Sequence, residues 1–264
     1  MTSGAVTVQV WRGGWQAGTR DVAPEVPVAL VYDGGTEAVM MASPSDLEDF
    51  GIGFSCTERI VASAAEIADI QVVAVEHGME VRMSLSGAQR ERLIDRRRLR
   101  AGPAGCGLCG IESLAEAVAP LPSLESAVRV TPEEVIAAMR ALSPLQVLNR
   151  STSAMHAAAL FRPGEGIIAV REDVGRHNAL DKLQGALVCS DSTARGGVIL
   201  MTSRISIELV QKAAVMGASV LAAVSAPTSL AIEQARRCGL TLVGIVRPDG
   251  LELFTGEERL RHAP

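Results

Sequence analysis

The chain has 264 residues, of which 48% are hydrophobic, 21% are charged and 3% are aromatic, and its formal net charge is -5. These values are typical of a globular protein with a sizeable core, and they argue against a general nucleic-acid binder, which would be basic or rich in aromatic side chains. No apolar run is long enough to cross a bilayer, and the N-terminus has no basic start followed by an apolar core, so we expect neither a membrane partner nor export. Five cysteines, an odd number, favour a reducing compartment over a disulfide framework, which predicts a cytoplasmic protein.

The first third of the sequence predicts strands and one long helix. Val6, Val8 and Val10 alternate with polar residues, as they would in a strand with one covered face. Further strand patterns cover residues 26–32, 37–42, 67–75 and 80–85, and the first two of these resemble the two halves of a hairpin. Ser43, followed by a proline, is expected to cap a helix that runs to about residue 61.

A glycine-rich segment, residues 101–110, carries Cys106 and Cys109 at C-x-x-C spacing. Two thiols this close can bind one metal ion, form a disulfide, act as a reactive cysteine beside a second thiol, or simply be buried in a tight turn. Residues 111–118 have the pattern of a short helix, whose N-terminal dipole would favour a thiolate just before it. A basic run at 88–100 precedes the segment and is either a solvated helix face or a docking surface for an anionic ligand or an acidic partner.

Zinc hydrolysis and thioredoxin-like redox chemistry are both weakly supported. One C-x-x-C supplies half of a four-ligand structural zinc site, and the sequence has no second such pair. A nucleoside deaminase would place a histidine and, two residues later, a glutamate before its cysteine pair, whereas His156 follows the pair and Ala158 takes the place of the glutamate. A thioredoxin-like motif would lie near the first strand of a βαβ pattern, whereas this one lies between two predicted lobes. We therefore expect no metal site.

A proline- and serine-rich stretch at 120–130 is the predicted boundary between an N-terminal lobe, residues 1–125, and a C-terminal lobe, residues 126–264. Thr131 and Glu134 then form a capping-box pattern at the start of a helix. Strands are expected at 166–170, 197–201, 220–224 and 241–246, and helices at 179–188, 206–216 and 229–238. Apolar strands that alternate with helices favour a covered, mainly parallel sheet. The predicted fold class is α/β, with an α+β N-terminal lobe and a mainly parallel α/β C-terminal lobe.

Each strand of the C-terminal lobe is followed by a loop of polar or small residues, at 172–178, 202–204, 225–229 and 247–250. In a parallel sheet these loops would meet at the carboxyl ends of the strands, where ligands bind, and the helices after them would offer free N–H groups. Arg176, Arg204 and Arg247 would add guanidinium groups, which suit phosphate. The pattern indicates a pocket for a phosphorylated, nucleotide-bearing ligand, although polar loops are also the ordinary surface of a sheet.

Two histidines are candidates for this pocket. His156 lies in a stretch of small residues, 151–159, that resembles a helix start, and it is either an interior histidine with satisfied hydrogen bonds or a ligand contact. His177 lies among acidic and basic neighbours in the loop after the first strand of the lobe, which favours a functional role.

Eight segments of the chain, in this order and spacing, resemble the formate dehydrogenase accessory sulfurtransferase family (FdhD/NarQ) over nearly its whole length. They are EVPVALVY (25–32), VMMASPSDLEDFGIGF (39–54), GCGLCG (105–110), HAAAL (156–160), EDVGRHNALDK (172–182), TSRISIELVQKA (202–213), SAPTSLA (225–231) and LTLVGIVR (240–247). Each segment alone is weak, but the combination is highly specific.

The resemblance implies a sulfur relay. Members of the family accept sulfane sulfur from a cysteine desulfurase as a persulfide and pass it to the molybdenum bis(molybdopterin guanine dinucleotide) cofactor, which formate dehydrogenase needs in sulfurated form. Cys106 matches the persulfide carrier, Cys109 matches the second thiol, and residues 245–250 match the cofactor-binding stretch. The resemblance also implies a fold similar to cytidine deaminases, a homodimer, and a guanine nucleotide such as GDP as a mimic of the cofactor.

The predicted site therefore has a catalytic pair and a cofactor-binding set. The pair is Cys106 and Cys109, and the cofactor-binding set is Ile245, Val246, Arg247, Pro248, Asp249, Gly250, His156, Asp173, Arg176, His177, Ser203 and Arg204. The chain departs from the family pattern at residues 151–155, which replace a turn that often contains glycine, and at Arg59, which replaces a usual glycine. The alternative hypothesis is a chaperone that binds the molybdenum cofactor and delivers it to formate dehydrogenase without transferring sulfur.

Overall fold

The computed structural model describes residues 4–261 apart from positions 88, 92, 94–119 and 126–127. The C-x-x-C segment with Cys106 and Cys109, the helix expected at 111–118 and most of the basic run at 88–100 lie outside the described residues. No helix in the described part of the chain is both long enough and apolar enough to span a membrane.

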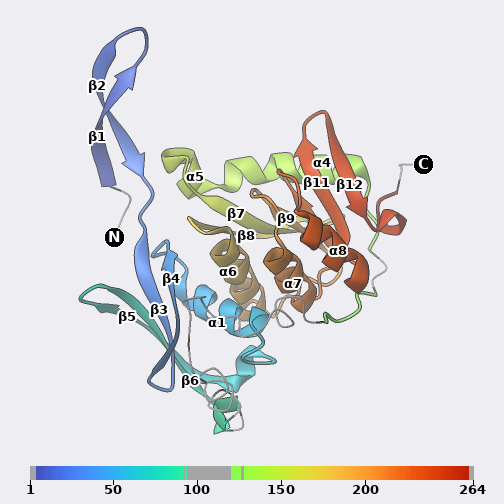
Figure 1. Ribbon diagram of the computed structural model, residues 1–264, viewed down its shortest axis with the longest axis horizontal. Helices are drawn as coiled ribbons and strands as arrows, with labels where there is room; N and C mark the ends of the chain where they lie inside the picture. The colour runs from blue at the N-terminus through green and yellow to red at the C-terminus, as the bar shows by residue number, and fades with distance from the viewer. Residues whose placement is uncertain (1–3, 88, 92, 94–119, 126–127, 262–264) are drawn as a thin grey trace.

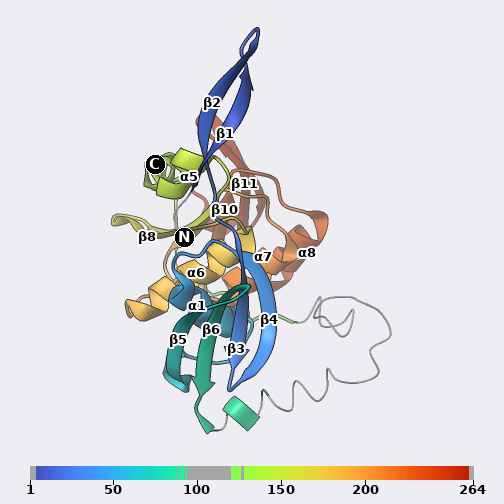
Figure 2. The same cartoon turned by 90° about the vertical axis from the view of Figure 1, so that its left-hand side faces the viewer.

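The chain starts with a hairpin, named here the arm, that projects from the rest of the molecule (Figures 1 and 2). The arm consists of β1 (Gly4–Trp11) and β2 (Trp15–Val22), which pair antiparallel. A four-stranded sheet follows, in the order β4-β3-β6-β5, with β3 and β6 parallel and the outer pairs antiparallel. Its strands are β3 (Val26–Tyr32), β4 (Gly35–Ala42), β5 (Ile67–Val75) and β6 (Gly78–Leu85). The helix α1 (Leu47–Thr57) packs on one face of this sheet through Leu47, Phe50 and Phe54.

A second sheet has six strands in the order β12-β11-β10-β9-β7-β8. They are β7 (His156–Arg162), β8 (Gly166–Asp173), β9 (Val198–Met201), β10 (Val220–Ala223), β11 (Thr241–Arg247) and β12 (Gly250–Thr255). β9, β10 and β11 are parallel, whereas β7, β8 and β12 join through antiparallel pairs. The helices are α4 (Pro132–Leu142), α5 (Val147–Thr152), α6 (Arg176–Cys189), α7 (Ile207–Val215) and α8 (Ser229–Cys238), with short 3-10 turns at Ala64–Glu66, Ser143–Leu145 and Glu257–Arg259.

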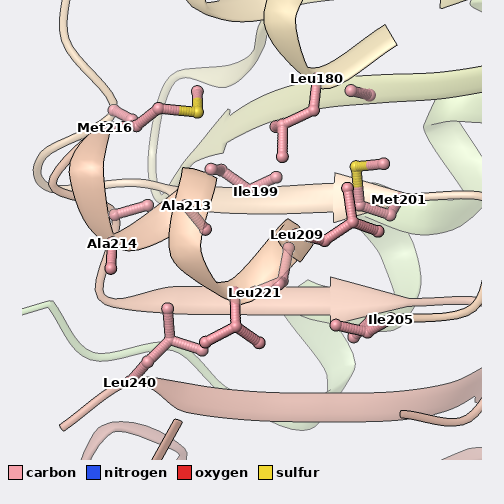
Figure 3. Close-up of a cluster of buried hydrophobic side chains, with 14 of the residues drawn as sticks. Leu180, Ile199, Met201, Ile205, Leu209, Ala213, Ala214, Met216, Leu221 and Leu240 are labelled. Carbon is pink, nitrogen blue, oxygen red and sulfur yellow. The ribbon is translucent and has the colours of Figure 1, made fainter. Parts of the chain in front are cut away.

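The central strands of the six-stranded sheet are buried on both faces. On one face α6, α7 and α8 pack over the sheet, and Figure 3 shows Ile199 and Leu221 of the sheet beside Leu209 of α7, all fully buried. On the other face α4 contributes Val135 and Leu142 to a second apolar cluster. Burial on both faces explains why β9 and β10 are continuous apolar runs rather than alternating patterns.

The α/β class predicted from the sequence is confirmed, together with the hairpin at 26–42, the strands of the four-stranded sheet and the three strand–helix units of the six-stranded sheet. The capping box of α4 is present, because the N–H of Glu134 donates to Thr131 Oγ1 at 3.2 Å and the N–H of Thr131 donates to Glu134 Oε2 at 2.8 Å. The division into lobes at residue 125 stays a prediction.

Three local predictions are wrong. The stretch at 151–159 is not a helix start: α5 ends at Thr152 and His156 begins β7, whose alanines 157–159 are fully buried between the two helical layers. Ser43 does not cap α1, which starts at Leu47. The sequence pattern also missed β7 and β12, which run against the other four strands of a sheet that is otherwise parallel in direction.

The first helix also ends earlier than residue 61. α1 stops at Thr57, and Arg59 has a φ of 57°, in the left-handed region that glycine adopts at little cost. The resemblance places a glycine at this position, so the arginine keeps the helix-ending conformation at a cost of about 1 kcal/mol.

The backbones of α1 and α6 touch where the two helices cross. A Cβ atom added at Gly53 of α1 would lie 1.7 Å from the carbonyl oxygen of Asp181, and one added at Gly185 of α6 would lie 1.9 Å from the carbonyl oxygen of Asp49. Glycine is required at both positions because any side chain would push the helices apart. Since α1 covers the four-stranded sheet and α6 covers the six-stranded sheet, this crossing sets the distance between the two halves of the molecule.

We predict that Gly53→Ala lowers the free energy of unfolding by about 3 kcal/mol or prevents folding, because the new methyl group overlaps backbone atoms that cannot rotate away. Urea unfolding at pH 7.5 measures the effect. Gly87→Ala is the matched control, since a Cβ there meets no atom within 4 Å and alanine favours a helical position. Equal stability of Gly53→Ala and wild type would show that the crossing tolerates separation.

Candidate functional site

Four of the strands end at the same edge of the six-stranded sheet. β9, β10 and β11 are parallel, and β8 runs in their direction because β7, antiparallel to both β8 and β9, lies between them. The first residue of β7, His156, lies at this edge and pairs with Asp173 at the end of β8. The structure therefore brings together all four predicted loops and adds the start of β7.

Asp173 is buried beneath the loop that it begins. Its Oδ2 accepts hydrogen bonds from Lys182 Nζ at 2.6 Å and from the N–H of Ser43 at 2.9 Å. Its Oδ1 accepts from the N–H of Gly175 at 2.7 Å and from Asn178 Nδ2 at 2.9 Å. The side chains of Asp173 and Lys182 are both 0% exposed. With every lone-pair direction of the carboxylate used within the protein, Asp173 positions the loop rather than facing a ligand, in contrast to the direct contact predicted for it.

Ser43 connects this loop to the other half of the molecule. Besides the bond from its N–H to Asp173, its Oγ accepts from the N–H of Val174 at 3.2 Å and its carbonyl oxygen accepts from Lys182 Nζ at 3.0 Å. Ser43 follows β4 of the four-stranded sheet, so a residue of the N-terminal half fixes the start of the β8–α6 loop.

The charge of Arg176 acts on both predicted histidines. Burial lowers the pKa of His156, and the guanidinium of Arg176 lowers it further against the opposing effect of Asp173. Burial, with Arg176 as the next cause, lowers the pKa of His177 to about 4. The Nε2 atom of His177 lies 3.4 Å from Ser206 Oγ and 3.9 Å from Glu208 Oε2. Both imidazoles are therefore neutral at pH 7, and the positive charge here belongs to Arg176.

Arg176 begins α6, where free backbone N–H groups also favour an anion. Its Nε atom is buried and has no hydrogen-bond partner among the described residues. An unsatisfied buried donor of this kind is normally paired with a water, an ion or a ligand. The position therefore fits the phosphate contact predicted for Arg176.

The loops after β9 and β10 run side by side. Ile205 and Pro227 form a parallel bridge, and the N–H of Thr228 donates to the carbonyl oxygen of Ile205 at 2.9 Å. Ser203 is 3% exposed and its Oγ donates to the carbonyl oxygen of Arg204 at 2.9 Å, so Ser203 shapes the loop while the side chain of Arg204 is exposed. Thr202, which sequence reasoning did not single out, accepts from the N–H of Ala157 at 2.9 Å and joins the loop to β7.

The predicted cofactor-binding stretch, residues 245–250, divides into a buried and an exposed part. Val246 is buried, Ile245 and Gly250 are half-buried, and Arg247, Pro248 and Asp249 form an exposed turn between β11 and β12. Nη1 of Arg247 donates to the carbonyl oxygens of Val224 and Val246, which ties this turn to the β10 loop.

Ile245 has a φ of 50°, a conformation rare for a β-branched residue. Such strain costs of the order of 1–3 kcal/mol and clusters at functional sites. It is accompanied by a shift in the register of β11 and β12 between Gly244 and Arg247. The strain thus marks the point where β11 leaves the regular sheet and turns toward the edge.

Several of the residues that organise this edge were not predicted as site residues. Lys182, Ser43 and Thr202 hold the loops from below, and Ser206 and Glu208 lie beside His177. One sequence signal pointed to them, because all five fall within the segments that carry the family resemblance. Cys106 and Cys109 lie outside the described residues, and among those described there is no cluster of three or more residues that could hold a metal ion.

The fold is that of an α/β protein whose two sheets are joined through packed helices, and polar loops and arginines gather at the carboxyl ends of the strands of its six-stranded sheet. The model of the FdhD/NarQ family matches residues 23–261, and the chain belongs to this family. It is 52% identical over 244 residues to the Sulfur carrier protein FdhD of Agrobacterium fabrum, covering 92% of this chain and 90% of the relative. It is 47% identical over 263 residues to the protein of the same name from Cupriavidus necator, covering 99% and 91%.

A solved structure supports the same assignment. The crystal structure of a protein from Desulfotalea psychrophila, provisionally described as a formate dehydrogenase accessory protein, is similar with a TM-score of 0.78. The two sequences are 25% identical, and the match covers 98% of this chain and 99% of the other.

The depressed pKa of His177 predicts a specific pH dependence of stability. The imidazole binds a proton below about pH 6.5 in the unfolded chain but only below about pH 4 in the folded protein. The free energy of unfolding therefore decreases as the pH falls through this window. Between pH 7.5 and pH 5 the loss from this one group is about 2 kcal/mol. We predict that His177→Gln shows a smaller drop in unfolding free energy than wild type over this range, by about that amount, in urea titrations at the two pH values.

His77→Gln is the control for this measurement, because His77 is exposed and its side chain is 89% accessible. An equal drop for wild type and His177→Gln would show that the imidazole charges freely in the folded protein.

Proposed function

We propose that this protein is a sulfur carrier that takes persulfide sulfur from a cysteine desulfurase onto Cys106 and transfers it to the molybdenum bis(molybdopterin guanine dinucleotide) cofactor, which formate dehydrogenase requires. The observation that carries the proposal is the 52% identity, over 92% of this chain, to a protein named Sulfur carrier protein FdhD. The chain has the residues for such a role, since Cys106 and Cys109 stand two residues apart in a glycine-rich segment.

The sulfur transfer balances without an external oxidant. The thiolate of Cys106 attacks the outer sulfur of the donor persulfide, a new S–S bond forms on Cys106, and the donor leaves as a thiolate. In the second half the outer sulfur passes to the cofactor as sulfane sulfur and the Cys106 thiolate is restored, and the reduced metal of the substrate cofactor would supply the two electrons that take this sulfur to the sulfide level. Cys109 can also resolve the persulfide, because attack of its thiolate on the Cys106 sulfur forms a Cys106–Cys109 disulfide and releases the outer sulfur as hydrosulfide.

The edge of the six-stranded sheet is the proposed binding place for the nucleotide part of the cofactor, which is a substrate here. The guanidinium groups of Arg176, Arg204 and Arg247 and the N-termini of three helices suit phosphate oxygens. A guanine nucleotide such as GDP would bind at the same place as a mimic. The proposed partners are a cysteine desulfurase as sulfur donor and a formate dehydrogenase as client. The protein is further proposed to be a homodimer and to be located in the cytoplasm.

The first test is persulfide loading. We expect intact-protein mass spectrometry to show one added sulfur after incubation with a cysteine desulfurase and cysteine, on the peptide that contains Cys106 and Cys109, and removable by reductant. Cys106→Ala should abolish the added sulfur. Cys189→Ala is the control, because Cys189 is exposed to reagents but is a poor nucleophile. Partial desolvation of its thiol and the neighbouring carboxylates of Asp49 and Glu48 raise its pKa, which disfavours the reactive thiolate.

The Cys106→Ala variant also distinguishes a sulfur carrier from a chaperone that only delivers the cofactor. A carrier without Cys106 loses activation of its formate dehydrogenase, whereas a delivery chaperone keeps most of it. No added sulfur in wild type with an active, cognate desulfurase would contradict the carrier and favour the chaperone.

The second test addresses nucleotide binding. Arg247→Ala should weaken the affinity for GDP by about tenfold or more, because a charge-assisted hydrogen bond to phosphate contributes about 1.5–3 kcal/mol. Persulfide loading should remain at the wild-type level. Calorimetric titration with GDP measures the affinity, and Arg237→Ala is the control, since Arg237 is an exposed arginine of α8 paired with Glu233. Wild-type GDP affinity in Arg247→Ala would exclude this residue from the nucleotide site.

A further inference from the structure

The helix α7 begins at the middle of the carboxyl edge, the edge of the six-stranded sheet at which β8, β9, β10 and β11 end. α6, α7 and α8 follow β8, β9 and β10, and α7 lies between the other two helices (Figure 1). The first turns of α6 and α8 contain no acidic residue, whereas that of α7 contains Glu208. Since a helix N-terminus attracts anions, α6 and α8 leave this attraction to a ligand, and α7 directs it to a carboxylate of its own.

The carboxylate of Glu208 lies beside the arginine that is proposed to hold phosphate. Its Oε2 atom is 3.9 Å from Nε2 of His177, the residue that follows Arg176, and its side chain is 49% exposed. Burial opposes the charge on Glu208, but hydrogen bonds from Ser206 and from its own backbone N–H outweigh it and lower its pKa, an effect that Arg176 strengthens. The carboxylate is therefore ionised at neutral pH and half-exposed where a ligand would approach Arg176.

The nearby lysine does not offset this negative charge. Lys212, one turn further along α7, lies 2.9 Å from Asp181 Oδ1 and 2.7 Å from Glu58 Oε1, so two carboxylates already match its charge. Burial, with Arg176 as the next cause, lowers the pKa of His177 to about 4 and keeps this imidazole neutral at pH 7. The part of the carboxyl edge between α6 and α7 therefore presents the positive charge of Arg176 beside a fixed negative charge.

A fixed negative charge beside a phosphate site distinguishes two kinds of diphosphate. The terminal phosphate of a nucleoside diphosphate or triphosphate has a second ionisation with a pKa of about 6, so it bears close to two negative charges at neutral pH. In a dinucleotide both phosphates are internal and each bears a single charge. A neighbouring carboxylate repels the terminal phosphate more than the internal one, because Coulomb repulsion grows in proportion to the charge.

We propose that Glu208 is a specificity-determining residue that selects the internal diphosphate of a dinucleotide over a free nucleoside diphosphate or triphosphate. This selection rests on the proposed function, in which the nucleotide part of the cofactor binds at the carboxyl edge. The arginines alone cannot provide it, since guanidinium groups bind all phosphates and favour the most highly charged ones. With Glu208 in place, additional negative charge on the ligand no longer increases its affinity to the same extent.

Calorimetric titration of the full chain with three guanine nucleotides, at pH 8 and without magnesium, tests this selection. GDP-mannose has an internal diphosphate, whereas GDP and GTP end in a terminal phosphate. Glu208→Gln keeps the size of the side chain and removes its charge. We expect this variant to bind GTP about tenfold and GDP-mannose about threefold more tightly than wild type, with GDP between them, because the repulsion that is removed scales with the charge of the ligand.

Two control variants separate the local charge of Glu208 from other effects of substitution. Glu208→Asp keeps the charge and should preserve the wild-type ratios among the three affinities. Glu257→Gln removes the same charge from the exposed turn after β12, at the opposite end of the sheet, and should leave all three affinities unchanged. Each nucleotide is compared with itself between wild type and variant, so contacts made by the mannose cancel.

Three results would overturn the proposal. Equal changes in the three affinities of Glu208→Gln, or no change, would remove the selection and leave the nucleotide site in place. Weaker binding of all three nucleotides would show that Glu208 attracts the ligand as a hydrogen-bond acceptor instead of repelling its charge. Failure of wild type to bind any of the three would contradict the proposed nucleotide site itself, and the selection with it.

Discussion

The contact between the backbones of α1 and α6 is the constraint on which the two halves of this protein depend. With glycine at 53 and 185 the helices lie close enough for each to contact a carbonyl oxygen of the other, and each helix covers a different sheet. The short distance lets residues at the ends of α1 reach side chains of α6. Ser43 before α1 reaches Lys182, and Thr57 at its end donates to Asp181 at 2.6 Å. A wider crossing would break both connections, so the glycines support the polar network as well as the packing.

The adjacent residues Asp181 and Lys182 of α6 connect this polar network to the β8–α6 loop and to α7. Lys182 extends to Asp173 and so holds the β8–α6 loop, whereas Asp181 accepts from Lys212 of α7 at 2.9 Å. Burial disfavours the charge on Lys212, but the carboxylates of Asp181 and Glu58 outweigh it and raise its pKa. A buried pair of this kind is costly to break, by about 3–5 kcal/mol when one partner is lost, although it adds little net stability. The polar network instead fixes the position of the β8–α6 loop of the candidate site, so the orientation of this loop depends on residues from both halves of the molecule.

Helices and strands with a clear hydrophobic pattern could be predicted from the sequence. Segments whose composition suits both a helix and a strand could not. The strand–helix units after residue 166 were predictable because their strands are apolar runs and their helices follow turn-forming loops. β7 was not, since an alanine-rich segment suits a helix by propensity and becomes a strand only because two layers leave room for small side chains. The loops of the site were predictable from the rule that strand ends converge, and their residues do lie at one edge. The burial of Asp173 was not, because it depends on Ser43, which is 130 positions away in the chain.

The charge distribution at this edge suits binding of an anion better than acid–base chemistry. Lys182 and Lys212, the nearby lysines, are neutralised by buried carboxylates, so the described positive charge available to a ligand lies on arginines, which keep it at every physiological pH. The histidines at 156 and 177 have lowered pKa values and are uncharged at pH 7, and His177 Nε2 lies within hydrogen-bond distance of Ser206 Oγ. Transfer of sulfur from a persulfide requires a thiolate and a well-placed acceptor but no proton transfer at the nucleotide. In the proposed function, the arginines of this edge would hold phosphate by fixed charges and the separate C-x-x-C segment would supply the reactive sulfur, which is the division of work that a carrier needs.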